Sequence, residues 1–293
     1  MPTIHEPVLL KEVLSYFDPQ PGDNFIDCTF GGGGHSLAIL ERVKPLGRVL
    51  GIDWDQQAVQ SSGSQNLILV NNNYKNLKKI IHDHGISKPD GILLDLGLSS
   101  DQLGADRGGF GFQSEGPLDL RYSRQSERPT AGEVLRNYSE EELFKIFKEY
   151  GEEPLARAVA KKIIASRRLG HLPETAAMLV QLVSEVYKKY FKTPSRRNPA
   201  TRVFQALRIE VNDEWGNLRA VLPEAVEVLP AGGRLAVISF HSGEDRIVKN
   251  FFKQQVALGR IKILTKKPLV AGEDELEKNP RSRSAKMRVA ERI

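Results

Sequence analysis

The chain has 293 residues, of which 40% are hydrophobic and 27% are charged. This balance is typical of a globular protein and excludes a disordered or fibrous chain, and the length predicts one domain plus an insertion. No stretch approaches the ~20 apolar residues of a membrane span, and residues 1–11 lack the pattern of a signal peptide. The single cysteine, Cys28, excludes internal disulfides and cysteine-rich zinc sites, so we expect a cytoplasmic protein.

The net charge of +5 is concentrated in two regions. Residues 120–200 hold 16 lysines and arginines against 10 acids, and residues 278–293 hold six basic residues with only Glu291 opposing them. A basic run taken alone is usually a solvated helix face. Two such regions in one chain favour a partner with a phosphate backbone.

The first elements predict a site for a nucleotide-like ligand. An amphipathic helix is expected over Val8–Phe17, and a short strand at Phe25–Ile26 leads into Asp27. Four glycines, residues 31–34, follow and open a helix over Ser36–Val43. Strand, glycine turn and helix is the arrangement that binds nucleotides in α/β proteins. A carboxylate repels a pyrophosphate but attracts an ammonium or sulfonium group, so Asp27 favours S-adenosylmethionine over NAD.

The next two strands supply further ligand candidates. The strand Arg48–Ile52 ends in Asp53, at the spacing from the glycines that suits a ribose diol, whereas Asp55 is expected to cap a helix from Gln56. A third strand over residues 66–70 is followed by Tyr74, which is either a platform for adenine or a surface tyrosine. In the helix expected over residues 76–84 the two histidines do not share a face, so a metal pair is not predicted there.

A fourth strand repeats the pattern. Residues 90–94 form an apolar strand that ends in Asp95, before a polar loop that contains Ser99. Parallel strands that end in Asp27, Asp53 and Asp95 bring three carboxylates to one edge of a sheet. Clustered carboxylates repel one another unless a cationic or donor-rich ligand joins them. The sequence therefore predicts an enzyme or a cofactor-binding protein.

After Ser100 the alternation of strands and helices stops. A glycine-rich loop is expected over residues 101–120, and helices follow from Ser139, where Ser139 and Glu142 form a capping box. Apolar residues at helical spacing indicate two more helices, the second with Tyr190 in its stripe. We predict an inserted, all-helical subdomain over residues 107–196, and a main domain made of residues 1–106 and 197–293.

The main domain resumes with a helix over Thr201–Asn212, and Pro223 is expected to kink or divide its continuation. A fifth strand over residues 233–238 leads to His241, which is either a base or substrate contact or a structural histidine. After a helix over residues 244–255, short strands at 261–264 and 287–289 complete a seven-stranded sheet.

From residue 5 to residue 292 the chain resembles the ribosomal RNA small subunit methyltransferase H family. The motifs that carry the resemblance are residues 27–36, 90–100, 107–112, 116–121, 199–212, 239–249 and 279–284. The resemblance implies a Rossmann-like class I methyltransferase fold, with a seven-stranded, mostly parallel sheet. It implies S-adenosylmethionine-dependent N4-methylation of a cytidine in the decoding centre (P site) of 16S ribosomal RNA. It also implies a cytoplasmic location and the small ribosomal subunit as partner. The inserted helices are thought in this family to help recognise RNA.

The resemblance also assigns residues. It implies cofactor contacts at Gly33, Gly34, His35, Asp53, Tyr74, Asp95 and Gln102. As a hypothesis, Asp95 orients the amine and the methyl donor, Ser99 and His241 line the base pocket, and no metal takes part. RNA contacts are expected at Arg202, Phe204 and Arg208, with Phe110, Phe112 and Phe240 as further stacking candidates for a flipped base. The competing classes are an NAD-dependent oxidoreductase and a non-catalytic RNA-binding protein. A homodimer is compatible with the sequence, which does not define the oligomeric state.

Overall fold

The structure, a computed structural model, describes residues 7–60, 63–97, 109–193 and 198–293. The chain divides into two compact units. The first unit, which we call the sheet unit, consists of residues 1–99 and 215–293. The second, the helical unit, consists of residues 100–214. Each unit is described by itself.

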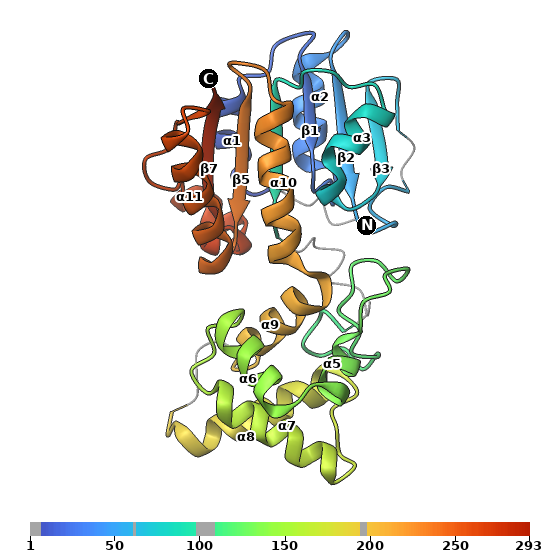
Figure 1. Cartoon of the computed structure of the whole chain (residues 1–293), viewed down its shortest axis with the longest axis vertical. Coiled ribbons are helices and arrows are strands. Elements are labelled where there is room, and N and C mark those ends of the chain that lie inside the picture. The colour runs from blue at the N-terminus through green and yellow to red at the C-terminus, as the bar shows by residue number, and fades with distance from the viewer. Residues whose placement is uncertain (1–6, 61–62, 98–108, 194–197) are drawn as a thin grey trace. The chain divides into compact units, whose positions relative to one another are not determined.

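A seven-stranded sheet forms the centre of the sheet unit (Figure 1). Its order is β3-β2-β1-β4-β5-β7-β6, and every neighbouring pair from β3 to β5 is parallel, whereas β7 is antiparallel to both β5 and β6. The strands are β1 (Asn24–Asp27), β2 (Arg48–Asp53), β3 (Leu67–Asn71), β4 (Gly91–Asp95), β5 (Arg234–Ser239), β6 (Ile261–Ile263) and β7 (Lys286–Arg292). The prediction of an α/β fold with a mostly parallel, seven-stranded sheet is confirmed.

Helices cover both faces of this sheet (Figure 1). On one face α3 (Leu77–Asp83), α10 (Glu214–Val228) and α11 (Ser242–Ala257) pack on alternate strand residues such as Ile26 and Ile92. On the other face α1 (Leu10–Phe17) and α2 (Gly34–Val43) pack on the intervening residues, among them Phe25 and Leu93. Successive side chains of a strand point to opposite faces, so a sheet covered on both sides requires apolar residues at nearly every position.

The direction of the strands defines two edges. Strands β1 to β6 end at one edge, which we call the carboxyl edge, and β7 begins there because it runs antiparallel. Short elements flank the strands: η1 (Tyr74–Asn76) after β3, and α12 (Glu273–Lys278) and η2 (Pro280–Ser284) before β7. In doubly wound folds the ligand binds at the carboxyl edge.

The helical unit is built from five helices in its described part. These are α5 (Ala131–Asn137), α6 (Glu140–Glu149), α7 (Ala156–Arg168), α8 (Ala176–Tyr190) and α9 (Thr201–Asn212). The predicted capping box is present: Ser139 accepts a hydrogen bond from the Glu142 N–H, and the Glu142 carboxylate accepts one from the Ser139 N–H. A second capping box joins Thr130 and Glu133 at the start of α5. The last residue of α8, Tyr190, is 61% exposed, so its assignment to an apolar stripe was wrong.

Two boundaries differ from those expected. Helix α9 belongs to the helical unit, where its apolar side packs against α5 and α6, whereas the sequence placed residues 197–214 in the main domain. The long helix divides at Asp213, whose φ of 51° is left-handed, and not at Pro223, which lies inside α10. Leu218, Val221 and Leu222 are fully buried around the proline, so packing maintains the helix where the proline removes one hydrogen bond.

Candidate cofactor and substrate site

Asp27 stabilises the glycine turn from inside the protein. Its side chain is buried, and Oδ2 accepts a hydrogen bond of 2.7 Å from the Ser36 hydroxyl. Oδ1 accepts from the backbone N–H of Thr29 at 3.1 Å and from its hydroxyl at 3.3 Å. The expectation that this carboxylate faces a cationic ligand is therefore wrong. It joins the end of β1 to the first turn of α2.

The glycines give the turn its shape. Gly31 and Gly33 have φ values of 51° and 78°, in the left-handed region that other residues avoid. A Cβ atom on Gly33 would lie 2.7 Å from the ring of Phe30, and one on Gly34, the first residue of α2, 3.0 Å from Pro7. The backbone before α2 therefore packs closely on its neighbours. A turn without side chains of its own also lets a ligand approach the main chain.

Asp53 connects the end of β2 to this turn. Its Oδ2 accepts a 2.8 Å hydrogen bond from the Gly31 N–H, and its Oδ1 accepts one of 2.8 Å from the Asp55 N–H. Burial raises the pKa of the Asp53 carboxyl to about 6, although both backbone donors favour the ionised form. Asp55 in turn accepts from the Gln57 N–H, but a turn and not a helix follows it.

Asp95 is the strongest ligand candidate at the carboxyl edge. Its backbone N–H donates to the Thr29 hydroxyl at 2.7 Å, which joins the ends of β1 and β4. Its Oδ2 lies 3.7 Å from His35 Nδ1, and its buried Oδ1 has no hydrogen-bond donor within the described ranges. Burial raises the pKa of the Asp95 carboxyl to about 6, although the nearby His35 ring and the Gly97 N–H favour the ionised form. A buried oxygen without a donor is costly and marks a place for a ligand donor.

The His35 ring is held by a backbone carbonyl. Its Nε2 lies 2.9 Å from the carbonyl oxygen of Val8, and a carbonyl can only accept, so Nε2 carries a proton. The other ring nitrogen, Nδ1, faces Asp95. Sequence reasoning missed Thr29. Its side chain contacts both Asp27 and Asp95, but a single threonine follows no sequence motif.

Tyr74 lies at the same edge of the sheet. It opens η1, which directly follows β3 through the cap residue Asn73. The ring is half-buried against the core beneath α3. Its position next to the end of β2 agrees with a platform for an aromatic base.

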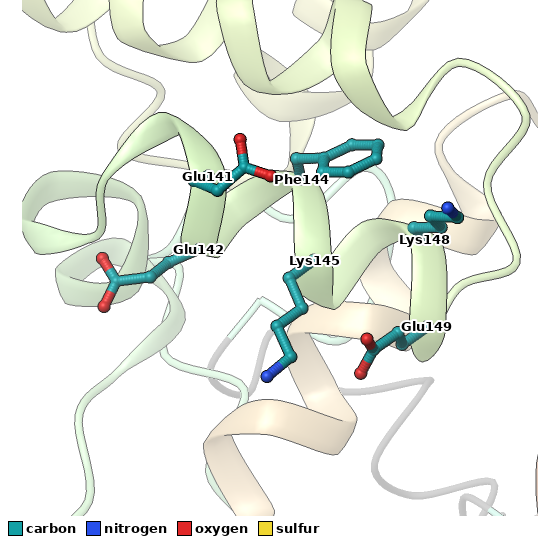
Figure 2. Close-up of a pocket in the computed structure, with 6 residues that line it drawn as sticks. All are labelled: Glu141, Glu142, Phe144, Lys145, Lys148 and Glu149. Atoms are coloured by element: carbon teal, nitrogen blue, oxygen red, sulfur yellow. The ribbon is translucent and has the colours of Figure 1, made fainter.

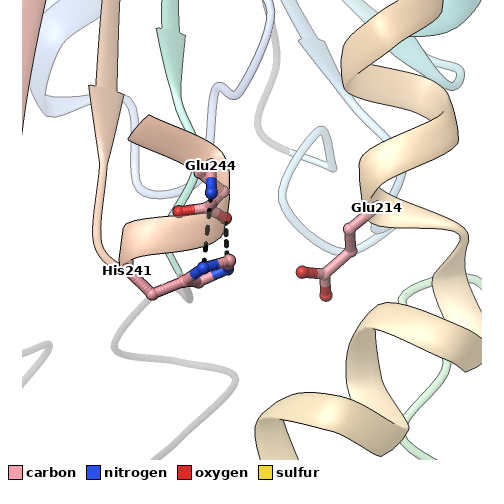
Figure 3. A group of neighbouring side chains, drawn as sticks. All are labelled: Glu214, His241 and Glu244. Carbon is pink, nitrogen blue, oxygen red and sulfur yellow. Dashed lines mark hydrogen bonds and ion pairs between the residues drawn. The ribbon is translucent and has the colours of Figure 1, made fainter. Parts of the chain in front are cut away.

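His241 caps α11. Its Nδ1 accepts from the Glu244 N–H at 3.4 Å, and its Nε2 lies 3.1 Å from the buried Glu244 carboxylate, outside hydrogen-bond angles (Figure 3). The second Glu244 oxygen accepts from the Phe240 N–H at 2.9 Å. Nδ1 of His241 is thus engaged in capping its own helix, whereas Nε2 has no hydrogen-bond partner among the described residues. The structural alternative fits this geometry better than a general base does.

An aromatic cluster surrounds this turn within the sheet unit. The rings of Trp215 and His241 are stacked with centroids 6.3 Å apart. A Cβ atom on Gly243 would lie 2.2 Å from Trp215, and one on Gly97 would lie 2.7 Å from Phe240. The two glycines therefore allow the rings to pack against the ends of β4 and β5. Sequence reasoning missed Trp215, since an isolated tryptophan follows no motif.

The predicted RNA contacts on α9 are largely internal. Phe204 is 6% exposed and meets the Phe112 ring edge-on at 5.1 Å, so the expectation that it stacks on a base was wrong. Arg208 donates two hydrogen bonds, of 2.7 and 3.1 Å, to the carboxylate of Glu214, which Figure 3 also labels. Arg202 is exposed and donates to the Glu152 carbonyl at 3.0 Å.

The polar side of α9 packs within the helical unit because the segment before α5 lies against it. The Asn212 amide is buried and donates to the Leu120 carbonyl, and Phe110 is buried against the Tyr122 ring. Two further predicted residues, Ser99 and Gln102, lie outside the described residues.

A shallow hollow on α6 does not fit an anionic ligand. The Phe144 ring lies under the Arg157 guanidinium, 3.6 Å from the ring centroid. Acidic and basic side chains both line it (Figure 2), and the lining residues are Glu141, Glu142, Phe144, Lys145, Lys148 and Glu149. Its three glutamates outnumber its two lysines, so we interpret this surface as a solvated helix face.

The sheet order, the glycine turn and the acids at the ends of β2 and β4 define a doubly wound protein that binds a nucleoside-containing cofactor. The model of the MraW methylase family matches residues 2–293, and the chain belongs to this family. The family uses S-adenosylmethionine, so the cofactor prediction is confirmed. The site fits this cofactor, because acidic side chains stand at the ends of β2 and β4, Asp95 Oδ1 has no donor among the described residues, and the turn at Gly31 and Gly33 carries no side chains.

Relatives match over the whole chain. The chain is 45% identical to a ribosomal RNA small subunit methyltransferase H from Thermomicrobium roseum, with 99% of this chain and 94% of the relative covered. It is 42% identical to a protein of the same name from Carboxydothermus hydrogenoformans, with 99% and 98% covered. A solved rRNA methylase from Streptococcus thermophilus aligns with a TM-score of 0.43 and 9% identity over 96% of each chain. No helix in the described ranges is both long and apolar enough to cross a membrane.

Proposed function

We propose that this protein methylates N4 of a cytidine in the decoding centre of 16S ribosomal RNA, with S-adenosylmethionine as methyl donor. The observation that carries the proposal is the Asp95 carboxylate, whose Oδ1 is buried without a donor at the end of β4, beside the glycine turn of a methylase chain. The names of the full-length relatives support a small-subunit RNA substrate. Such a substrate would place the enzyme in the cytoplasm.

The reaction requires alignment more than acid–base catalysis. The exocyclic amine of cytidine is a weak nucleophile, because its lone pair is delocalised into the ring. S-adenosylmethionine supplies an activated methyl group bound to a positively charged sulfur. Orientation lowers a barrier by roughly 7–11 kcal/mol, whereas a general base gives about 10²–10⁴-fold. We therefore assign positioning as the main task of the site.

Asp95 is suited to orient the amine. Its Oδ1 is free to accept an amine N–H, which returns electron density to the nitrogen. Thr29 holds the backbone of Asp95 in place, and the His35 ring lies beside its second oxygen. His241 would line the base pocket as part of the Phe240–Trp215 aromatic cluster, without taking a proton. All these residues come from one chain, so the proposal requires no homodimer.

The helical unit would recognise RNA, through the end of α8 and not through α9. Tyr190 and Phe191 are 61% and 48% exposed. Three exposed lysines surround them, Lys188, Lys189 and Lys192. The preceding acid, Glu185, is paired with Lys162 at 3.0 Å. Aromatic rings among lysines bind single-stranded RNA by base stacking and phosphate attraction.

The test is methyl transfer from radiolabelled S-adenosylmethionine to small ribosomal subunits and to protein-free 16S RNA, with the product nucleoside identified by mass spectrometry. We expect N4-methylcytidine at one site. A label on another base or position would refute the assigned reaction. A protein that binds the cofactor and RNA but transfers no methyl group would support the non-catalytic class.

A further inference from the structure

An arginine-bearing turn lies at the carboxyl edge of the sheet. This turn is η2, Pro280–Ser284, and it precedes β7 by one residue. In the antiparallel register Lys286, the first residue of β7, is opposite Ser239, the last residue of β5. The Ser239 hydroxyl also donates to the Lys286 carbonyl at 3.2 Å. The turn therefore lies at the edge where Phe240 and His241 follow β5.

The backbone of the turn is held from inside. Ser282 is buried, and both its N–H and its hydroxyl donate to the Asn279 carbonyl, at 3.0 and 2.7 Å. The Ala285 N–H donates to the Ser282 carbonyl at 2.9 Å. Arg281 and Arg283 alternate with these buried residues and are exposed. A buried scaffold thus fixes the backbone that carries the exposed Arg283.

Three hydrogen bonds connect the turn to the cofactor site. The Asn279 N–H donates to the Glu275 carbonyl at 2.7 Å, and the Glu275 carboxylate accepts from the Leu9 N–H at 2.8 Å. The preceding residue, Val8, accepts from His35 at 2.9 Å, and His35 faces Asp95. Turn and site therefore belong to one hydrogen-bonded part of the sheet unit, so their spacing is preset.

The charge of Arg283 is not neutralised by an ion pair within the described structure. Its side chain has no ion-pair partner among the described residues, whereas Arg288, five residues on, forms a bidentate pair with Asp245 at 2.6 and 3.2 Å. The acids of α12 lie mainly in its first turn, where they complement the helix amino terminus. A cationic cofactor would be repelled by a guanidinium, but a phosphate would be bound by it.

We propose that Arg283 binds a backbone phosphate of the RNA next to the target nucleotide. The inference rests on the proposed function. Arg283 is a positioning residue: it would hold the RNA strand at a set distance from Asp95 and would not touch the reacting atoms. Backbone contacts of this kind set the register of a nucleic acid without reading its sequence.

The test compares Arg283→Ala with Arg260→Ala. Arg260 is an exposed arginine of the same unit that directly precedes β6, at the opposite edge, where Ile261 pairs with Arg292. We expect Arg283→Ala to weaken binding of 16S RNA about tenfold, as loss of a charge-assisted hydrogen bond does. The salt dependence of binding should fall by about one phosphate contact. KM for RNA should rise while kcat and the affinity for S-adenosylhomocysteine stay unchanged, and Arg283→Lys should recover part of the loss.

Equal RNA affinity and equal salt dependence in the two alanine variants would overturn the proposal. So would a loss seen only with assembled subunits and not with protein-free RNA, because the partner would then be a ribosomal protein. If the wild-type protein transfers no methyl group, the proposed function fails. Binding measured by fluorescence anisotropy would still decide the role of Arg283.

Discussion

A single hydroxyl group joins the two strand ends that matter most to the site. Thr29 donates to Asp27 and accepts from the Asp95 N–H, so one side chain sets the spacing between the glycine turn and the end of β4. The carboxylates of Asp27 and Asp95 differ in their hydrogen bonding. Asp27 is saturated by internal donors, whereas Asp95 retains an oxygen for a ligand.

Asp95→Asn should lower the rate of methyl transfer at saturating cofactor by about 100-fold, the range typical for loss of one preorganised polar contact. The amide keeps the shape of the side chain but weakens its ability to accept an amine hydrogen. Single-turnover transfer to small-subunit RNA measures this rate, and calorimetry with S-adenosylhomocysteine confirms that the site is occupied. A near-normal rate in the loaded variant would remove Asp95 from the mechanism.

Cofactor affinity should fall as the pH drops through about 6. The pKa values of Asp53 and Asp95 are raised to about 6 in the folded protein. Protonation of each acid therefore contributes to the stability of the ligand-free fold. This contribution is complete below pH ~3.8 and is lost as the pH rises through 6, so the ligand-free fold favours the protonated acids. A ligand with an ammonium group and a ribose diol favours the ionised acids instead.

The measurement is titration with S-adenosylhomocysteine between pH 5 and 7.5. The dissociation constant should rise by up to about tenfold per pH unit for each linked group below pH 6. Asp95→Asn should reduce this dependence and leave the part due to Asp53. A flat profile in the wild-type protein would show that neither carboxylate is linked to binding.

At the scale of elements, the ion pair between Arg208 and Glu214 closes the end of α9. The two side chains are only 15% and 10% exposed. The Glu214 carboxylate also accepts from the Tyr122 hydroxyl at 2.8 Å. An arginine that appeared in the sequence as an RNA contact is thus part of the packing between α9 and the loop before α5.

Arg208→Ala should destabilise the helical unit by roughly 3 kcal/mol, because it leaves a largely buried carboxylate unpaired. Denaturant unfolding followed by circular dichroism measures this change. Arg202→Ala, at an exposed position on the same helix, is the control and should change stability by less than about 0.5 kcal/mol. Unchanged stability in Arg208→Ala, together with weakened RNA binding, would instead support the original prediction of an RNA contact at Arg208.

At the scale of the whole molecule, the chain separates two tasks. The sheet unit holds the residues around the cofactor, and the helical unit carries the exposed aromatic and basic end of α8. Each unit has its own buried core, so changes to the surface of one are expected to leave the chemistry of the other intact.

Replacing Tyr190 and Phe191 together by alanine should weaken binding of single-stranded RNA at least tenfold, because stacking contributes about 1–3 kcal/mol per base. Cofactor affinity should not change. Met178→Ala is the matched control, since Met178 is a 43% exposed apolar residue in the first turn of the same helix. Fluorescence anisotropy with a short RNA measures both variants. Equal losses in the two would indicate a general effect on α8 and not a stacking surface.

The sequence by itself determined the succession of the seven strands, the glycine turn and the acids at the ends of β2 and β4. These features are local, because they depend on periodicity, turn chemistry and the residue that follows each strand. Only the tertiary structure decided which polar groups remain available. Asp27 and Arg208 carry the same chemical groups as ligand residues, yet their partners Ser36 and Glu214 already occupy them. Whether a buried charge is satisfied depends on the neighbours that folding brings to it, and its own position in the sequence does not reveal them.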